Sequence, residues 1–121
     1  MNPGSSHQDL VAWQEAMRLV EMVYRCTALF PKVEMFGLSA QLRRSAVSIP
    51  SNIAEGAGRN SSRELFQFLG IANGSLAEVQ TQLEIARRLG YLEPGTECPK
   101  QASRVGKLLI GLRRAIQDRG I

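Results

Sequence analysis

The chain has 121 residues, of which 44% are hydrophobic and 21% charged, and its formal net charge is +4. These values are typical of one soluble globular domain, and no apolar run approaches the ~20 residues that a membrane-spanning helix needs. Residues 1–8 are polar and lack the basic and apolar blocks of a secretory signal. We therefore expect a disordered tail over 1–8, one domain over 9–121, no membrane association and a cytoplasmic location.

Arginine dominates the basic residues, since it supplies twelve of the fifteen. Its rigid guanidinium suits phosphate recognition and buried ion pairs alike, so the basic excess is compatible with a nucleic-acid partner or with internal pairing. Cys26 and Cys98 are too few and too far apart in sequence to suggest a disulfide framework or a zinc site. We expect reduced thiols, no metal and no other cofactor.

A first helix is predicted over residues 10–29, where Phe30-Pro31 stops it because the residue before proline avoids the helical region. Its main apolar stripe comprises Leu10, Trp13, Met17, Val20 and Tyr24, which Ala16, Leu19 and Val23 extend sideways. An apolar arc this broad indicates burial against more than one neighbour.

A second helix is predicted over 37–58, with an apolar stripe formed by Leu38, Leu42, Ile49, Ile53 and Ala57. Pro50 lies inside it, removes one N–H donor and clashes with the Ala46 carbonyl, so we expect a kink that the tertiary structure must hold. Asn52 and Glu55 here, with Ser75 and Glu78 on the next helix, are expected to form a hydrogen-bond network that stabilises the kink rather than an acid–base pair.

The segment 56–64 is rich in glycine and serine and resembles a phosphate-binding loop, but it follows no strand and lacks the lysine of a nucleotide loop. A helix junction explains it better. Gly58 or Asn60 is then expected to adopt the left-handed C-cap conformation, and Ser61-x-x-Glu64 to form a capping box for the following helix.

A third helix is predicted over 62–89, ending at Gly90. Its heptad-like seam consists of Leu65, Leu69, Ala72, Leu76, Val79, Leu83 and Ala86, and Phe66, Phe68, Ile71, Ile85 and Leu89 widen it. Gly70 and Gly74 have the spacing of a close helix crossing, although the same glycines could simply weaken the helix.

A fourth helix is predicted over 100–119, with Val105, Leu108, Leu109, Leu112 and Ile116 on its apolar face. Lys100, Arg104, Lys107 and Arg114 follow the opposite face, and no acidic residue lies between Cys98 and Gln117. Four helices with short connections predict an all-α fold, an antiparallel up-down-up-down four-helix bundle.

Catalytic chemistry is not indicated. The single histidine, His7, lies in the predicted tail, so hydrolytic triads and multi-histidine metal sites have no base or ligand within the fold. The Glu-x-x-His repeats of di-iron bundles are also missing from the sequence. We therefore expect a protein that is not an enzyme, with no catalytic residues.

Several arginine and lysine groups are candidates for phosphate contacts, and each also has a structural interpretation. Arg43 and Arg44 diverge by about 100° on a helix, so one is expected to face Glu55 or Glu78 and the other solvent or phosphate. Arg59 and Arg63 flank the start of the third helix, where free N–H groups and the helix dipole favour an anion. The alternative is that both are ordinary surface charges. Arg87 and Arg88 lie at the end of the third helix, where positive charge interacts favourably with the helix dipole, so they are interpreted as structural. The candidate nucleic-acid-binding residues are Arg43, Arg44, Arg59, Arg63, Lys100, Arg104, Lys107 and Arg114.

Two motifs carry a family resemblance over about residues 9–116. They read Gly37-Leu38-x-x-Gln41-Leu42-Arg43-Arg44-Ser45-Ala46-x-Ser48-Ile49-Pro50-x-Asn52-Ile53-Ala54-Glu55-Gly56 and Gly74-Ser75-Leu76-x-Glu78-x-x-Thr81-Gln82-Leu83, followed by Ala86-x-x-Leu89-Gly90-Tyr91. The chain resembles the bacterial four-helix-bundle proteins called 23S rRNA intervening-sequence proteins, to which accessory proteins of diversity-generating retroelements are related. The resemblance implies an up-down-up-down bundle, a ring of five copies, and basic surfaces that engage nucleic acid.

Two functions follow as hypotheses. The first is a non-catalytic, homo-oligomeric protein that binds structured nucleic acid, for which rRNA is a candidate, through phosphate contacts. The second is a protein–protein assembly module without a direct nucleic-acid role, which the broad apolar arcs of the first and third helices favour.

Overall fold

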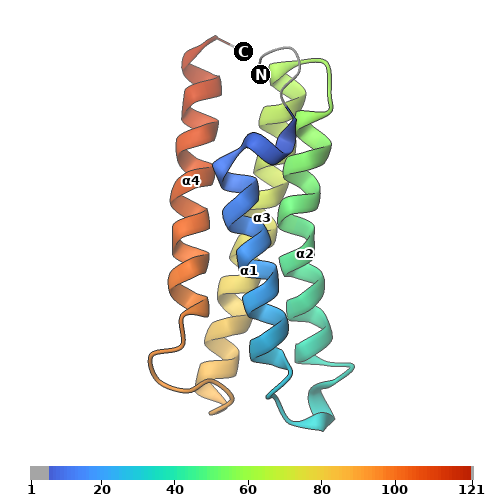
Figure 1. The fold of residues 1–121 in the computed structure, drawn as a ribbon, viewed down its shortest axis with the longest axis vertical. Coiled ribbons are helices and arrows are strands. Elements are labelled where there is room, and N and C mark those ends of the chain that lie inside the picture. The colour runs from blue at the N-terminus through green and yellow to red at the C-terminus, as the bar shows by residue number, and fades with distance from the viewer. Residues whose placement is uncertain (1–5, 121) are drawn as a thin grey trace.

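The structure, a computed structural model, describes residues 6–120, which form an all-helical bundle (Figure 1). The α-helices are α1 (Val11–Thr27), α2 (Leu38–Ala57), α3 (Ser62–Arg88) and α4 (Cys98–Asp118), and two 3-10 turns are η1 (His7–Asp9) and η2 (Lys32–Glu34). Each α-helix runs opposite to the one before it. Between residues 6 and 120, α1 and α3 each pack on α2 and α4, while the diagonal pairs make no close backbone contact. The predicted all-α four-helix bundle is confirmed.

The helix boundaries lie within two residues of those predicted. α4 begins earlier than expected, at Cys98, because Pro99 occupies its first turn, where a missing N–H costs nothing. Of the predicted tail over 1–8, residues 1–5 lie outside the described part of the chain, and His7 and Asp9 bound the short turn η1, which Ser6 caps. None of the helices between residues 6 and 120 is long and apolar enough to cross a membrane.

The core confirms the predicted faces of three helices and shifts that of α1. Along α3, every seam residue except Leu65 is buried, and α4 buries Val105, Leu109 and Ile116. On α1 the buried line is Ala12, Ala16, Leu19, Val23 and Thr27. The stripe that was predicted to be central lies at the edge of this buried line, since Met17 is 38% exposed and Tyr24 45% exposed. Small residues on α1 face the core because α2 and α4 approach that line from both sides.

The predicted left-handed cap after α2 is wrong. Gly58 has a φ of −81°, and within residues 6–120 positive φ angles occur only at Gly90, Gly95 and Gly120. At the start of α3, the Ser61 hydroxyl accepts from the Glu64 N–H at 3.1 Å, so the serine half of the capping box is present. The end at Gly90 is confirmed, because its φ of 79° lets the Tyr91 N–H reach the Ala86 carbonyl at 2.9 Å.

The close helix crossing predicted at Gly70 and Gly74 is also wrong. A Cβ at Gly74 would meet nothing within 4 Å, and one at Gly70 would meet only the Arg113 guanidinium. The close approach is instead at Gly56, where a Cβ would lie 2.7 Å from the Cβ of Phe68 on α3. This close approach lies beside the short junction between α2 and α3.

Candidate nucleic-acid interface

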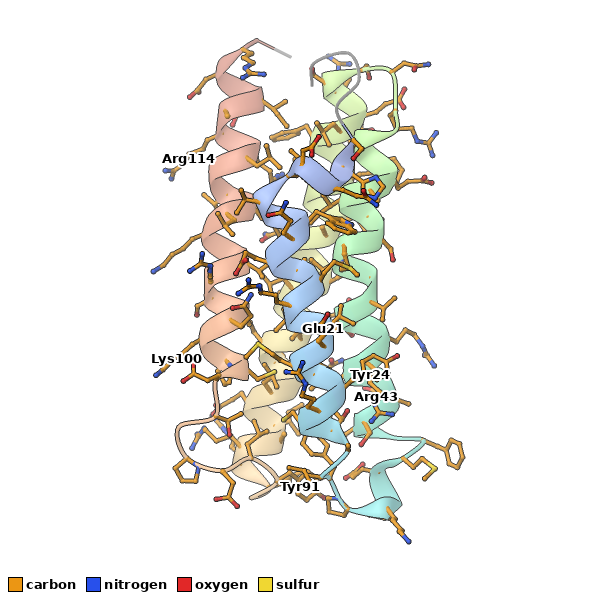
Figure 2. The ribbon with its side chains drawn as sticks, viewed as in Figure 1. Glu21, Tyr24, Arg43, Tyr91, Lys100 and Arg114 are labelled. Carbon is orange, nitrogen blue, oxygen red and sulfur yellow. The ribbon has the colours of Figure 1, made fainter. Side chains whose placement is uncertain are left out.

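The basic residues of α4 form one exposed strip along the bundle. Lys100, Arg104, Lys107 and Arg114, hereafter the α4 basic strip, are all exposed, and Figure 2 shows Lys100 and Arg114 projecting away from the bundle on the same side. The strip covers about 21 Å of helix at 1.5 Å per residue. Lys100, Arg104 and Lys107 line a shallow surface groove together with Ser103 and Leu108. An extended polyanion could follow this line.

The charges of the strip are not equally available. The Lys100 ammonium lies 3.8 Å from a Glu97 carboxylate oxygen, and the Arg104 guanidinium lies 2.9 Å from Glu15. Lys107 and Arg114 have no carboxylate within 4 Å among residues 6–120. The two cations toward the end of α4 are therefore the ones most ready to contact phosphate.

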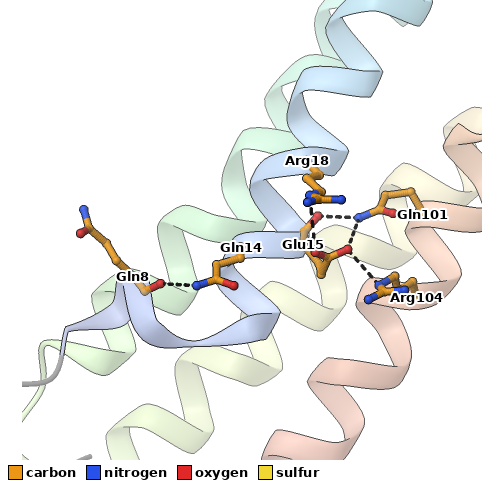
Figure 3. Close-up of polar contacts among 6 residues, drawn as sticks. All are labelled: Gln8, Gln14, Glu15, Arg18, Gln101 and Arg104. Carbon is orange, nitrogen blue, oxygen red and sulfur yellow. Dashed lines mark hydrogen bonds and ion pairs between the residues drawn. The ribbon is translucent and has the colours of Figure 1, made fainter.

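Glu15 is the acid that the α4 sequence lacks, and it comes from α1 (Figure 3). Its side chain is buried on the α1 surface that faces α4, where it forms an ion pair with Arg104 Nε at 2.9 Å and accepts a hydrogen bond from Gln101 Nε2 at 3.2 Å. Arg18 Nε lies 3.6 Å from its other oxygen. Gln101 also donates to the Glu15 backbone carbonyl at 2.9 Å. One buried carboxylate thus joins α1 to the basic face of α4.

Arg43 does not pair with Glu55 or Glu78 as expected. Its Nε donates to the Thr27 hydroxyl at 2.7 Å, and its guanidinium lies 4.7 Å from the Tyr24 ring centroid (Figure 2). The cation therefore sits at the carboxyl end of α1, where the helix dipole favours positive charge. Arg44 is exposed and, within the described residues, has no hydrogen bond or ion pair to protein, so it meets solvent as one of the pair was predicted to do.

Arg59 and Arg63 differ in the same way at the start of α3. Arg59 pairs with Glu55 at 3.2 Å and with Glu64 at 4.0 Å, and stacks over Phe68 at 5.0 Å. Arg63 is exposed and forms no ion pair within residues 6–120. Only Arg63 keeps an unneutralised charge for an anion at this helix end.

The arginine pair at the end of α3 is held by one carboxylate. Arg87 donates to both oxygens of Glu84 at 2.8 and 2.7 Å, and Arg88 Nε donates at 3.0 Å. These hydrogen bonds from Arg87 and Arg88 lower the pKa of Glu84 to about 2. The pair is therefore partly neutralised locally, which agrees with its structural interpretation.

The predicted polar network is present in part and has a different centre. Ser48 and Ser75 hydroxyls lie 2.8 Å apart across α2 and α3, and Asn52 Nδ2 donates to the Ser48 hydroxyl at 3.0 Å and carbonyl at 2.8 Å. Ser45 reaches Glu78 at 3.5 Å, whereas Glu55 faces outward to Arg59. The network therefore lies beside Pro50 and bridges the two helices, but Glu55 is not part of it.

Comparison with known families assigns the chain. Residues 8–111 match the model of a family described as 23S rRNA-intervening sequence protein. The chain belongs to this family. A search of the curated proteins returned no match. The family match agrees with the resemblance carried by the Pro50 segment, and membership of the 23S rRNA-intervening sequence family associates the chain with rRNA by name.

In this family member, the eight candidate residues do not form one patch. Arg43 and Arg44 lie on α2, diagonal to the strip on α4, and Arg59 and Arg63 lie at the junction of α2 and α3. Within residues 6–120, no group of three or more histidine, cysteine or acidic residues could hold a metal ion. The α4 basic strip is the one candidate group whose members share a helix face.

Sequence reasoning missed Glu15 and Ser48. Glu15 carried a signal, because it lies among Ala12, Ala16 and Leu19 on the apolar side of α1, where a carboxylate must be paired. Ser48 carried a weaker signal, since a serine inside a helix often bonds only the backbone of its own helix. Its partner Ser75 shows that the α2–α3 contact is tight at this level.

Proposed function

We propose that this protein is a non-catalytic, homo-oligomeric, cytoplasmic protein that binds structured RNA through the α4 basic strip. The observation that carries the proposal is that Lys107 and Arg114 have no carboxylate partner within residues 6–120, while Lys100 and Arg104 continue the same exposed line. The name of the family adds support for an rRNA-associated role. Binding rests on phosphate contacts and counterion release rather than on base readout.

The exposed candidates outside α4 extend this surface in an assembly. Arg44 and Arg63 are exposed and have no ion pair within residues 6–120. A ring of five copies would repeat each charge fivefold and bind one RNA at several points. Arg43 and Arg59, which contact protein groups, contribute mainly to structure. The relation to accessory proteins of diversity-generating retroelements stays a prediction from the sequence motifs.

The test replaces Lys100, Arg104, Lys107 and Arg114 together by glutamine and measures anisotropy of a labelled structured RNA over a salt series. The affinity is expected to fall roughly tenfold or more at low salt, and the slope of log K against log salt to become shallower by about 3, because each lost phosphate contact removes about 0.7–0.9. The matched control replaces Arg25, Lys32, Arg87 and Arg88, which lie outside α4 near the ends of α1 and α3, are exposed, and carry the same total charge.

Equal losses of RNA affinity in both variants would mean that binding depends on net charge and not on the α4 basic strip. Unchanged binding by a folded α4 variant would remove the strip from the proposal, and no binding by the wild-type protein near physiological salt would overturn RNA binding itself.

A protein–protein assembly module is the second candidate. The connection between α1 and α2 favours it, because Leu29, Val33 and Phe36 are 83%, 84% and 91% exposed. Apolar side chains gathered this openly mark surfaces that bind protein. A stoichiometric protein partner in a pull-down, with no RNA, would support this function over the first.

A further inference from the structure

The fold brings the two cysteines together, although they are far apart in sequence. Cys26 lies in the last turn of α1 and Cys98 is the first residue of α4. Both side chains line the same pocket. Both are free, and they differ in access, because Cys98 is 2% exposed whereas Cys26 is partly exposed. Two neighbouring free thiols, one of them accessible, are the arrangement from which thiol–disulfide exchange can form an intramolecular disulfide.

A pocket leads from the surface to this pair. It has a volume of about 480 Å³ and is lined by both cysteines and by apolar side chains that include Met22, Leu29 and Leu92. Tyr91, at the lower end of the bundle in Figure 2, forms part of its wall. Cys26 offers the more accessible sulfur to a small molecule in this pocket, because it is partly exposed whereas Cys98 is buried.

The proximity of the two sulfurs makes them chemically unequal. Interaction with Cys98 lowers the pKa of the Cys26 thiol, and the same interaction together with burial raises the pKa of Cys98. The thiolate is the nucleophile in thiol–disulfide exchange. The more accessible sulfur is therefore also the one that ionises more readily.

We propose that Cys26 and Cys98 form a reactive dithiol that a low-molecular-weight disulfide oxidises to an intramolecular Cys26–Cys98 disulfide. In the first step the Cys26 thiolate attacks one sulfur of the reagent, forms a mixed disulfide and releases one thiolate. In the second step Cys98, after losing its proton to solvent, attacks the Cys26 sulfur and displaces the second thiolate. The two cysteines lose two electrons to the reagent, whose sulfur–sulfur bond is cleaved to two thiols. Because both cysteines lie at helix ends, the sulfurs can close the remaining distance by local adjustment.

The test exposes the reduced protein to oxidised glutathione, quenches with acid at successive times, and locates the modified cysteines by intact-mass and peptide mass spectrometry. Wild-type protein is expected to gain a transient mixed disulfide on Cys26 and then convert to the internal disulfide. Cys98→Ala is expected to stop at the mixed disulfide on Cys26, and Cys26→Ala to lose the reaction. Wild-type protein that stays reduced at every ratio of oxidised to reduced glutathione would overturn the proposal.

A wild-type control in urea keeps the test independent of whether the variants fold. In the unfolded chain the thiols lose their contact, so both cysteines are expected to react at similar rates and the preference for Cys26 to disappear. The proposal is wrong if folded protein shows no more preference for Cys26 than the unfolded chain does. It is also wrong if the folded protein is modified first at Cys98.

Discussion

Among single residues, Gly56 is the described glycine with the least space for a side chain. The Leu65 and Phe68 side chains of α3 occupy the space into which a side chain at Gly56 would project. Because α2 and α3 are joined by a short connection, the backbones cannot separate there without disturbing the junction.

We expect Gly56→Ala to lower the free energy of unfolding by about 1–3 kcal/mol, since the new Cβ forces α2 and α3 apart. Gly74→Ala is the matched control on α3, where open space surrounds the glycine. It should raise the free energy of unfolding by up to about 1 kcal/mol through helix propensity. Urea unfolding followed by circular dichroism measures both. A Gly56→Ala protein as stable as its Gly74→Ala counterpart would contradict the close approach.

The Glu84 carboxylate makes the stability of the folded protein depend on pH. Its pKa is lowered from 4.5 to about 2 by hydrogen bonds from Arg87 and Arg88. The stabilisation is therefore fully present above pH 4.5 and is lost as the pH falls toward 2. Because the side chains are largely exposed, solvent screens the interaction and the effect on stability is small.

Replacing Arg87 and Arg88 by glutamine should return the pKa of Glu84 toward 4.5, because the charged donors that favour the carboxylate are gone. Carboxyl-detected NMR titration of the wild-type and variant proteins measures the shift directly. Identical titration curves for Glu84 in the two proteins would show that the arginines do not lower its pKa.

At the scale of elements, the contact between α1 and α4 sets the charge of the candidate interface. α4 has no acidic residue from Cys98 to Gln117, yet Glu15 on α1 contributes a carboxylate to the edge of its basic strip. Arg104 is consequently shared between the bundle and solvent, with its side chain 63% exposed. The packing of one helix therefore determines how much positive charge another presents.

Glu15→Gln should release Arg104 and increase RNA affinity several-fold, with a salt slope steeper by about 0.7–0.9. The variant should lose only about 1 kcal/mol of stability or less, because Arg104 stays hydrated and an amide oxygen can still accept from Gln101. Anisotropy over a salt series and urea unfolding give the two values. Glu21→Gln, which removes the same charge from the exposed Arg25 pair on α1, is the control. An equal gain in both variants would argue against a local effect.

At the scale of the whole molecule, part of the apolar surface is left uncovered by the bundle. The edge of α1 and the adjacent face of α2 form a shallow apolar groove lined by Trp13, Met17, Val20, Val47 and Ala54. Met17 and Val47 are 38% and 40% exposed there. The breadth of the apolar arc predicted for the first helix is explained if this groove packs on another copy.

We expect the wild-type protein to sediment as a pentamer, and Met17→Gln with Val47→Thr to dissociate it without loss of helicity, because both changes make the groove polar at constant charge. The dissociated form should bind RNA about 100-fold more weakly, since avidity is lost. Analytical ultracentrifugation and anisotropy provide the measurements. Ile85→Gln with Leu89→Gln, at exposed apolar positions in the last turn and the C-cap of α3, should leave the assembly intact. A monomeric wild-type protein would refute the assembly.

Much of the fold could be predicted from the sequence, because the patterns that indicate helices and their ends extend over only a few residues. The seam of α3 and the apolar face of α4 follow from helical periodicity, and Gly90 and Phe30-Pro31 mark helix ends through backbone chemistry. The α1 stripe was misplaced because periodicity favours large residues such as Met17, whereas the core there admits alanines such as Ala12 and Ala16. The left-handed cap was wrongly predicted at Gly58, because glycine can adopt either a positive or a negative φ and here adopts a negative one.

Local patterns were enough to predict the four α-helices of residues 6–120, their approximate ends and three of the four buried faces, since helix propensity and apolar spacing act over a few residues. Which cations are free depends on the packing of the helices, because Glu15 binds Arg104, Glu55 binds Arg59, and Thr27 accepts from Arg43. The same packing brings Cys26 and Cys98 to one pocket. Such contacts depend on how helices are placed around one another, a relation between distant segments that no local pattern contains.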